Sequence, residues 1–257
     1  MEQLLILLGI SVGINLIMFL IAFRFKTDKL TDISYAVTFV TLAFYGLISS
    51  HASITLIILT SMICIWALRL GLYLLQRIRR IGKDSRFDDK REKFWSFLGF
   101  WLLQGFTVWV VMLPSNLYYV SGGSQISILS LIGILLWICG LTIEAISDMQ
   151  KYNFINNEKN KGKWIEQGLW KYSRHPNYLG EIMVWLGIYI FTLTGLNTVQ
   201  SFIGLISPMY IATLLIFVSG IPLLEKSADE RWGKDPKYQT YKKQTSVLLL
   251  LPKRKIK

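Results

Sequence analysis

Long apolar runs alternate along the chain with short polar segments. Seven runs approach the roughly 20 mostly apolar residues that an α-helix needs to cross a bilayer. They lie at residues 4–23, 33–49, 53–75, 97–113, 126–146, 178–194 and 199–224. The first run follows Glu2, has no basic segment before it and ends without a small-residue cleavage site. We therefore expect it to remain as a helix rather than to be removed as a signal peptide.

The basic residues are confined to alternate connections between these runs. Of 28 lysines and arginines, three lie in 24–32, eight in 76–95, six in 147–176 and ten in 225–257. The segments expected as loops on the other side, 51–52, 114–125 and 195–198, have none. Cytoplasmic loops carry such an excess. The pattern predicts an all-α, multi-pass protein with seven transmembrane helices, an N-terminus outside and a cytosolic C-terminus.

Composition agrees with a single membrane domain over residues 1–257. Hydrophobic residues make up 53% of the chain and charged residues 17%, against about 25% charged in soluble proteins. The net charge is +12, and the basic residues lie between apolar runs. This arrangement favours membrane lipids or an anionic cofactor over nucleic acid as the partner. Two cysteines inside apolar runs and two histidines without an HExxH motif indicate neither a disulfide framework nor a metal site. We expect the protein in a bacterial cytoplasmic membrane.

Several ionisable residues fall within the apolar runs, where they are costly and usually face a cavity or a partner. Helical spacing places them on three stripes with aromatic residues. The stripes are Trp66, Arg69, Tyr73 and Arg77; Trp137, Glu144, Asp148 and Lys151; and Asn177, Glu181 and Trp185. Two interpretations remain open, a functional cavity on the cytosolic side or ion pairs that join helices.

The segment 168–181 opens the sixth run. Pro176 disfavours helix at His175 and suits a first helical turn, so we expect the helix to begin there. Its free N–H groups and positive dipole end then lie beside Arg174 and His175, which predicts a site for phosphate or carboxylate.

Three segments carry a resemblance to a known family. They are Ser147-Asp148-Met149-Gln150-Lys151, Tyr172-Ser173-Arg174-His175-Pro176-Asn177-Tyr178-Leu179-Gly180-Glu181, and Glu225-Lys226-Ser227-Ala228-Asp229-Glu230-Arg231-Trp232-Gly233 with Tyr238 and Tyr241. The chain resembles the steroid 5-alpha-reductase-like membrane enzymes, most closely their bacterial branch of unassigned function, over residues 148–257. Segments 69–73 and 82–87 extend the likeness more weakly. The Arg-His-Pro-x-Tyr element is also similar to isoprenylcysteine carboxyl methyltransferases, which bind S-adenosylmethionine.

The resemblance implies an NADPH-dependent reductase that transfers hydride to a lipophilic enone, such as a steroid, a sterol or a prenoid. It implies catalytic roles for Asp32 and Trp66. The cofactor-binding residues that it implies are Arg69, Tyr73, Arg77, Arg80, Arg86, Asp148, Lys151, Arg174, His175, Asn177, Tyr178, Glu181, Glu225, Asp229, Tyr238 and Tyr241.

Two departures from the family pattern concern the catalytic residues. Trp66 stands where the characterised steroid reductases have a catalytic tyrosine, and Thr31-Asp32 replaces their Gln-Glu pair. An indole donates a hydrogen bond but cannot serve as an acid. The cofactor half of the site is thus retained in sequence, whereas the half that activates the carbonyl is altered.

Other functions stay open at this stage. An S-adenosylmethionine-dependent methyltransferase would use the same C-terminal element, but its cofactor has no phosphate for the eight basic residues of 76–95. A non-catalytic lipid-binding bundle would explain the basic loops, although not Glu144 and Glu181. Trp232, Tyr238 and Tyr241 suit either an adenine ring or the membrane interface.

Overall fold

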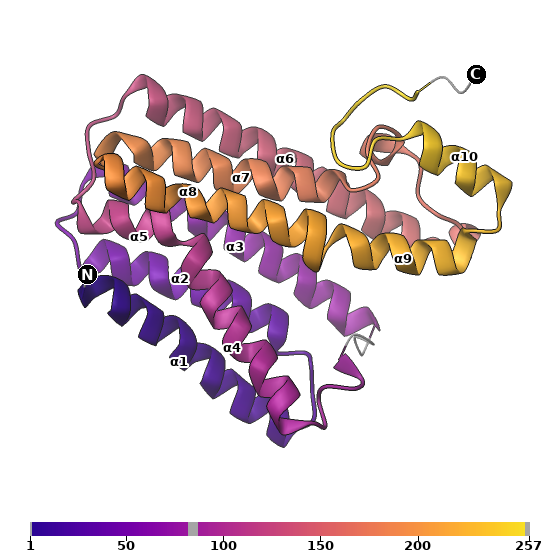
Figure 1. The fold of residues 1–257 in the computed structure, drawn as a ribbon, viewed down its shortest axis with the longest axis horizontal. Helices are drawn as coiled ribbons and strands as arrows, with labels where there is room; N and C mark the ends of the chain where they lie inside the picture. Colours follow the sequence, from indigo (N-terminus) through magenta and orange to yellow (C-terminus); the bar gives the residue numbers. More distant parts are fainter. Residues whose placement is uncertain (1, 82–86, 255–257) are drawn as a thin grey trace. The chain divides into compact units, whose positions relative to one another are not determined.

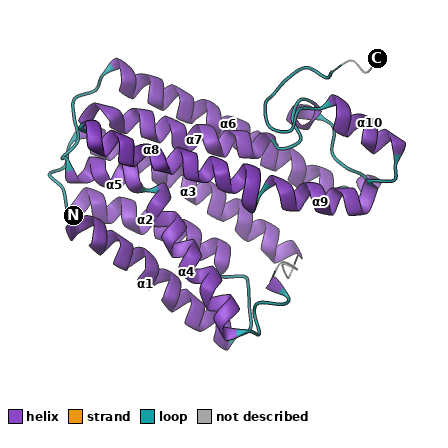
Figure 2. Ribbon diagram, viewed as in Figure 1, coloured by secondary structure: helices purple, strands orange, loops and turns teal. Residues whose placement is uncertain are grey.

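The computed structural model describes residues 2–81 and 87–254, and the described chain is helical apart from its connections (Figures 1 and 2). The helices are α1 (Glu2–Arg24), α2 (Thr31–Ile48), α3 (Ile54–Ile81), α4 (Phe94–Val111), α5 (Leu113–Val120), α6 (Ile128–Asn156), α7 (Pro176–Thr192), α8 (Thr198–Thr213), α9 (Ile221–Trp232) and α10 (Pro236–Gln244). Seven helical segments are long and apolar enough to cross a membrane, the last running from Thr198 through Trp232. The predicted number of spans is therefore confirmed.

Several spans extend further than their apolar runs. The fifth run was expected over 126–146, whereas α6 continues to Asn156 and has 29 residues. At 1.5 Å per residue it is about 43 Å long, which exceeds the roughly 30 Å hydrocarbon core. Its last turns therefore extend past the bilayer core, where polar side chains cost little and hydropathy gives no signal.

The expectation of a loop over 114–125 is wrong for its first half, because α5 occupies Leu113–Val120. Pro114 lies in the first turn, where its missing N–H costs nothing. Tyr119 is buried, and its hydroxyl lies 2.7 Å from Thr60 Oγ1. The tyrosine ring also fills the space beside Gly46, where a Cβ would come within 2.6 Å of its Cγ. This short helix is stabilised by tertiary packing. It could not be predicted from hydropathy because it contains no long apolar run.

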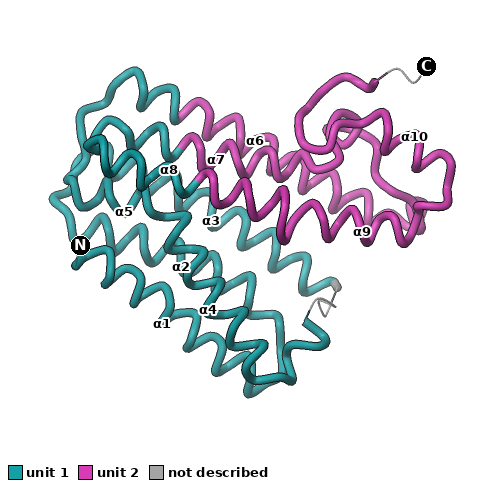
Figure 3. The backbone as a smooth tube through the Cα atoms, viewed as in Figure 1, with its two compact units in different colours: residues 1–133, 188–207 teal, residues 134–187, 208–257 magenta. Residues whose placement is uncertain are grey.

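The chain divides into two compact units, each discontinuous in sequence (Figure 3). Unit 1 comprises residues 1–133 and 188–207, and unit 2 comprises residues 134–187 and 208–257. Within unit 1, α1 packs on α4 and α2 packs on α3. Buried amide and hydroxyl groups join the helices: Asn15 donates to Thr38 Oγ1 at 3.2 Å, and Gln104 donates to Asn15 Oδ1 at 2.9 Å. Such bonds satisfy polar groups that lipid cannot.

Within unit 2, α6 and α7 approach each other closely at two glycines. A Cβ on Gly140 would lie 2.7 Å from Gly180 O, and one on Gly180 would lie 2.6 Å from Glu144 N. Only glycine permits this backbone contact. It brings the backbone of Glu144, a residue only 2% exposed, against the first turns of α7.

The seventh span changes its helical geometry partway. Pro208 lies inside α8, and Leu214–Val218 forms a π-helical turn before α9 begins. Both features interrupt the regular i to i−4 hydrogen bonding. The turn leads through Ser219 and Gly220 into α9, the helix that carries Glu225 and Arg231.

Candidate functional site

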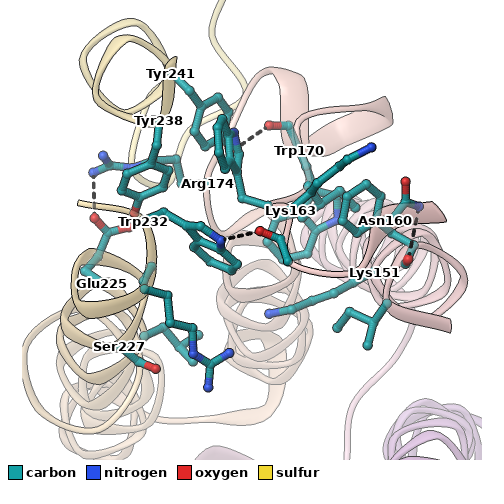
Figure 4. Close-up of a pocket in the computed structure, with 18 of the residues that line it drawn as sticks. Lys151, Asn160, Lys163, Trp170, Arg174, Glu225, Ser227, Trp232, Tyr238 and Tyr241 are labelled. Carbon is teal, nitrogen blue, oxygen red and sulfur yellow. Dashed lines mark hydrogen bonds and ion pairs between the residues drawn. The ribbon is translucent and has the colours of Figure 1, made fainter. Parts of the chain in front are cut away.

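A cavity of about 700 Å³ lies in unit 2 (Figure 4). Its walls come from the end of α6, the connection from α6 to α7, one face of α9, and α10. The size falls in the range of about 300–1,000 Å³ that is common for cofactor and small-molecule sites. The lining residues are mainly basic and aromatic.

The connection from α6 to α7 is joined to α6 by hydrogen bonds to the 147–151 segment. Trp170 Nε1 donates to Ser147 O at 3.0 Å, and Gln150 Oε1 accepts from Leu169 N at 2.9 Å. Gly168 has a φ of +60° and lies against the Gln150 side chain. A side chain at Gly168 would be strained and would also displace Gln150. These contacts fix Trp170 as one wall of the cavity.

Aromatic rings form a second wall. Trp164 lies 5.4 Å from Tyr238 and 6.3 Å from Trp232, ring centroid to centroid. Trp232 Nε1 donates to Gly162 O at 2.7 Å and so ties the connection to α9. Figure 4 shows Trp232 and Tyr238 close together at the cavity. Aromatic faces of this kind stack with nucleotide bases.

One carboxylate, Glu225, joins three basic side chains at the cavity wall. His175 Nε2 lies 2.8 Å from Glu225 Oε1, and Arg174 Nη2 lies 3.4 Å from Oε2. Lys242 Nζ lies 3.3 Å from Oε2 and also 2.6 Å from Asp229 Oδ1. Since a carboxylate only accepts, the proton lies on His175 Nε2. Arg174 additionally donates to Lys242 O at 3.0 Å.

The protonation of His175 is set mainly by burial. The residue is 5% exposed, and burial lowers the pKa of its imidazole below the usual 6.5, although the hydrogen bond and charge of Glu225 act in the opposite direction. The ring is therefore neutral at neutral pH. Among the described residues, its buried Nδ1 has no hydrogen-bond partner.

Three further cations line the cavity without a carboxylate of their own. Lys161, Lys163 and Arg231 are lining residues, and no carboxylate in the described part of the chain lies within 4.0 Å of them. With Arg174 and Lys151 they surround the cavity with positive charge, against the single acidic lining residue Glu225. Such a lining favours an anionic ligand.

The sequence-predicted residues of unit 2 divide into two groups. Six line the cavity, namely Lys151, Arg174, His175, Glu225, Tyr238 and Tyr241. Five others do not line it: Asp148 on α6, Asn177, Tyr178 and Glu181 on α7, and Asp229, which pairs with Lys242. The cofactor-binding roles of these residues stay predictions.

The remaining predicted residues belong to unit 1. Asp32 lies on α2, and Trp66, Arg69, Tyr73, Arg77 and Arg80 lie on α3. Arg77 Nη2 is 3.7 Å from Asp32 Oδ2, so these two are brought together. Trp66 is fully buried, with its ring 5.1 Å from that of Phe39. Arg86 falls outside the described residues.

Sequence reasoning missed Lys161, Lys163, Trp164 and Arg231. The first three lie in a polar connection, where basic residues also follow from membrane topology alone, so their charge carried no specific signal. Arg231 lies within a segment that carried the resemblance, and its spacing of three and four residues from Ala228 and Ser227 places it on their helix face.

Comparison with known families places these features in a wider group. The model of a family described as "Protein of unknown function (DUF1295)" matches residues 18–245. The chain belongs to this family. All cavity-lining residues of this DUF1295 protein fall within the matched range, so the cavity belongs to the region that defines the family. No curated protein and no solved structure matches the chain.

Proposed function

We propose that this protein is an NADPH-dependent membrane reductase that acts on a carbon–carbon double bond of a lipophilic enone. Unit 2 holds the cofactor, and the helices carry the chain through a cytoplasmic membrane with the N-terminus outside and the C-terminus in the cytosol. The proposal joins the resemblance of segments 147–151, 172–181 and 225–233 to steroid reductases with the chemistry of the unit 2 cavity.

The observation that carries the proposal is the group of cations without carboxylate partners, Lys161, Lys163 and Arg231. NADPH carries a pyrophosphate and a third phosphate, and each phosphate gains charge-assisted hydrogen bonds from lysine or arginine. S-adenosylmethionine has no phosphate and carries a positive sulfonium. A strongly basic cavity therefore favours the nicotinamide cofactor.

The residues present fit such a cofactor. Lys163 and Arg231 suit its phosphates, and the faces of Trp164, Trp232 and Tyr238 suit its adenine ring. Together these groups recognise an anionic purine nucleotide.

The bound cofactor supplies the hydride that the reduction requires. For the protein's own contribution, the resemblance suggests Asp32, which would assist protonation of the substrate, and Trp66, which stands at the position of the family's catalytic tyrosine. In the structure Asp32 is paired with Arg77 and Trp66 is fully buried, so both roles rest on the resemblance alone.

Cofactor binding tests the proposal directly. Purified full-length protein in detergent is titrated with NADPH, NADH and S-adenosylmethionine by calorimetry, and the double variant Lys163→Gln with Arg231→Gln is compared with wild type. We expect NADPH to bind most tightly. Loss of two charged hydrogen bonds, each worth about 1.5–3 kcal/mol, should weaken NADPH at least about a hundredfold.

Lys234→Gln is the matched control, because Lys234 is an exposed cation of unit 2 that does not line the cavity. It should leave NADPH affinity within about twofold, the size expected for a distant surface charge. Binding of S-adenosylmethionine without NADPH would replace the reductase by the methyltransferase. Binding of none of the three would contradict both.

A further inference from the structure

The last described part of the chain, residues 246–254, forms a segment that we call the C-terminal clamp. It runs beside residues 172–174, which are separated from the start of α7 by one residue, His175. Arg174 N donates to Ser246 O at 2.9 Å, Ser173 Oγ donates to Leu248 O at 2.7 Å, and Leu251 N donates to Tyr172 O at 3.4 Å. The clamp is therefore fixed to unit 2 at both of its ends.

These bonds determine the depth of the clamp relative to the membrane. The sixth span begins at Pro176, only two to four residues after the residues that the clamp contacts. Hydrogen-bonded segments lie within about 5 Å of each other. The clamp thus lies beside the start of the apolar part of α7, where we expect the membrane interface.

Apolar side chains of the clamp are exposed in alternation. Val247, Leu249 and Leu251 are 41%, 53% and 44% exposed, whereas Leu248 and Leu250 are less exposed. Tyr172, on the segment that the clamp contacts, is 40% exposed. Three aliphatic side chains and an aromatic ring in one small region would be unfavourable in water. The same set is typical of segments that enter a lipid interface.

Basic residues border this apolar surface. Lys171, Lys243 and Arg254 are exposed, and the described residues place no carboxylate within 4.0 Å of any of them. Exposed basic residues beside an apolar segment contact anionic lipid headgroups. The basic residues and the position of the clamp both favour an anionic membrane surface as its partner.

We propose that the C-terminal clamp docks on the membrane surface at the N-terminal end of α7. Val247, Leu249 and Leu251 enter the interface, and Lys171, Lys243 and Arg254 contact anionic headgroups. The proposal does not depend on the reductase assignment, because it uses neither a cofactor nor the cavity.

Depth-resolved fluorescence tests the docking. In a background with Cys64→Ser and Cys139→Ser, Leu249→Cys is labelled with an environment-sensitive dye, and the full-length protein is reconstituted into vesicles of phosphatidylglycerol and phosphatidylcholine in equal parts. Lys237→Cys on α10, an exposed polar position, is the control. We expect lipids brominated on their acyl chains to quench the dye at 249 several-fold more than at 237, and aqueous iodide to show the reverse order.

The charge contribution is measured in the same system. Lys243→Gln with Arg254→Gln should reduce lipid quenching at 249 in the anionic vesicles and leave it unchanged in phosphatidylcholine alone. Gel filtration and thermal unfolding show that each variant is folded. Equal iodide quenching at 249 and 237 would overturn the proposal. If the dye at 249 is protected from iodide in detergent, and this protection increases with protein concentration, the surface instead contacts a second copy of the chain.

Discussion

His175 is held in one orientation by a stacking contact and a hydrogen bond. Its ring lies 5.8 Å from that of Tyr178 with an interplanar angle of 10°, and its Nε2 is bonded to Glu225. A histidine fixed in this way presents its other nitrogen in a constant direction. The cost of this arrangement is that the buried ring resists protonation.

Acid should therefore destabilise the protein through His175. Below about pH 6.5 the unfolded chain takes up a proton at this residue, whereas the folded chain, in which the pKa of His175 is lowered by burial, does not until the pH is lower still. The unfolded state is then favoured as pH falls. We expect the unfolding temperature of wild type to decrease from about pH 7.5 to about pH 5.5, and to decrease less in His175→Gln.

His51, the other histidine, provides the control. It is exposed, so His51→Gln should reproduce the wild-type dependence on pH in the same thermal unfolding series. Parallel curves for wild type and His175→Gln would show that the buried ring contributes nothing to the acid sensitivity.

Single residues differ in how well the sequence revealed them. Arg174 and His175 could be predicted as site residues because Pro176, next to them in sequence, marks the start of a helix. That signal is local. Lys163 and Arg231 are 68 positions apart in sequence, and they line one cavity only because Trp232 bonds to Gly162. No local pattern encodes that contact.

At the scale of elements, the close contact of α6 with α7 depends on the absence of two side chains. Gly180 belongs to the segment 172–181 that resembles the reductases, and in the structure it packs against Gly140. The two helices carry predicted residues on both sides of this contact, Asp148 and Lys151 on α6 and Asn177 and Glu181 on α7.

Gly180→Ala should destabilise this helix pair. The added Cβ would lie 2.6 Å from Gly140 O and Glu144 N, both backbone atoms that move only with the helix, and overpacking of this kind costs about 1–3 kcal/mol. We expect a lower unfolding temperature in detergent. Gly99→Ala on α4 is the control, since nothing lies within 4 Å of its added Cβ, and alanine there should be neutral or slightly stabilising. A stability of Gly180→Ala equal to that of Gly99→Ala would refute the contact.

Elements were easier to predict than their ends. Hydropathy located all seven spans because lipid imposes about 20 apolar residues on each. It missed α5, a short buried helix stabilised by particular contacts such as Tyr119 with Thr60 rather than by a long apolar run. It also missed the last turns of α6, which are polar.

At the scale of the whole molecule, the distribution of charge makes the topology testable. Gln125 and Lys159 are exposed positions in connections that we assign to opposite sides of the membrane. In spheroplasts expressing a chain without its native cysteines, we expect Gln125→Cys to react with a membrane-impermeant maleimide. Lys159→Cys should react only after the membrane is permeabilised. Reaction of both, or the reverse order, would contradict the positive-inside assignment.

The C-terminal clamp has a consequence for biosynthesis. Arg174 and Ser173 are made before the seventh span, yet their hydrogen-bond partners Ser246 and Leu248 are made after it. Tyr241, which bonds to Trp170 O at 2.9 Å, also follows all seven spans. Every helix can therefore enter the membrane while the nucleotide-sized cavity is still incomplete. A nascent chain that stops after the seventh span would have the transmembrane topology of the finished protein but not its cavity, and its unpaired Tyr172–Arg174 segment would be open to quality-control proteases.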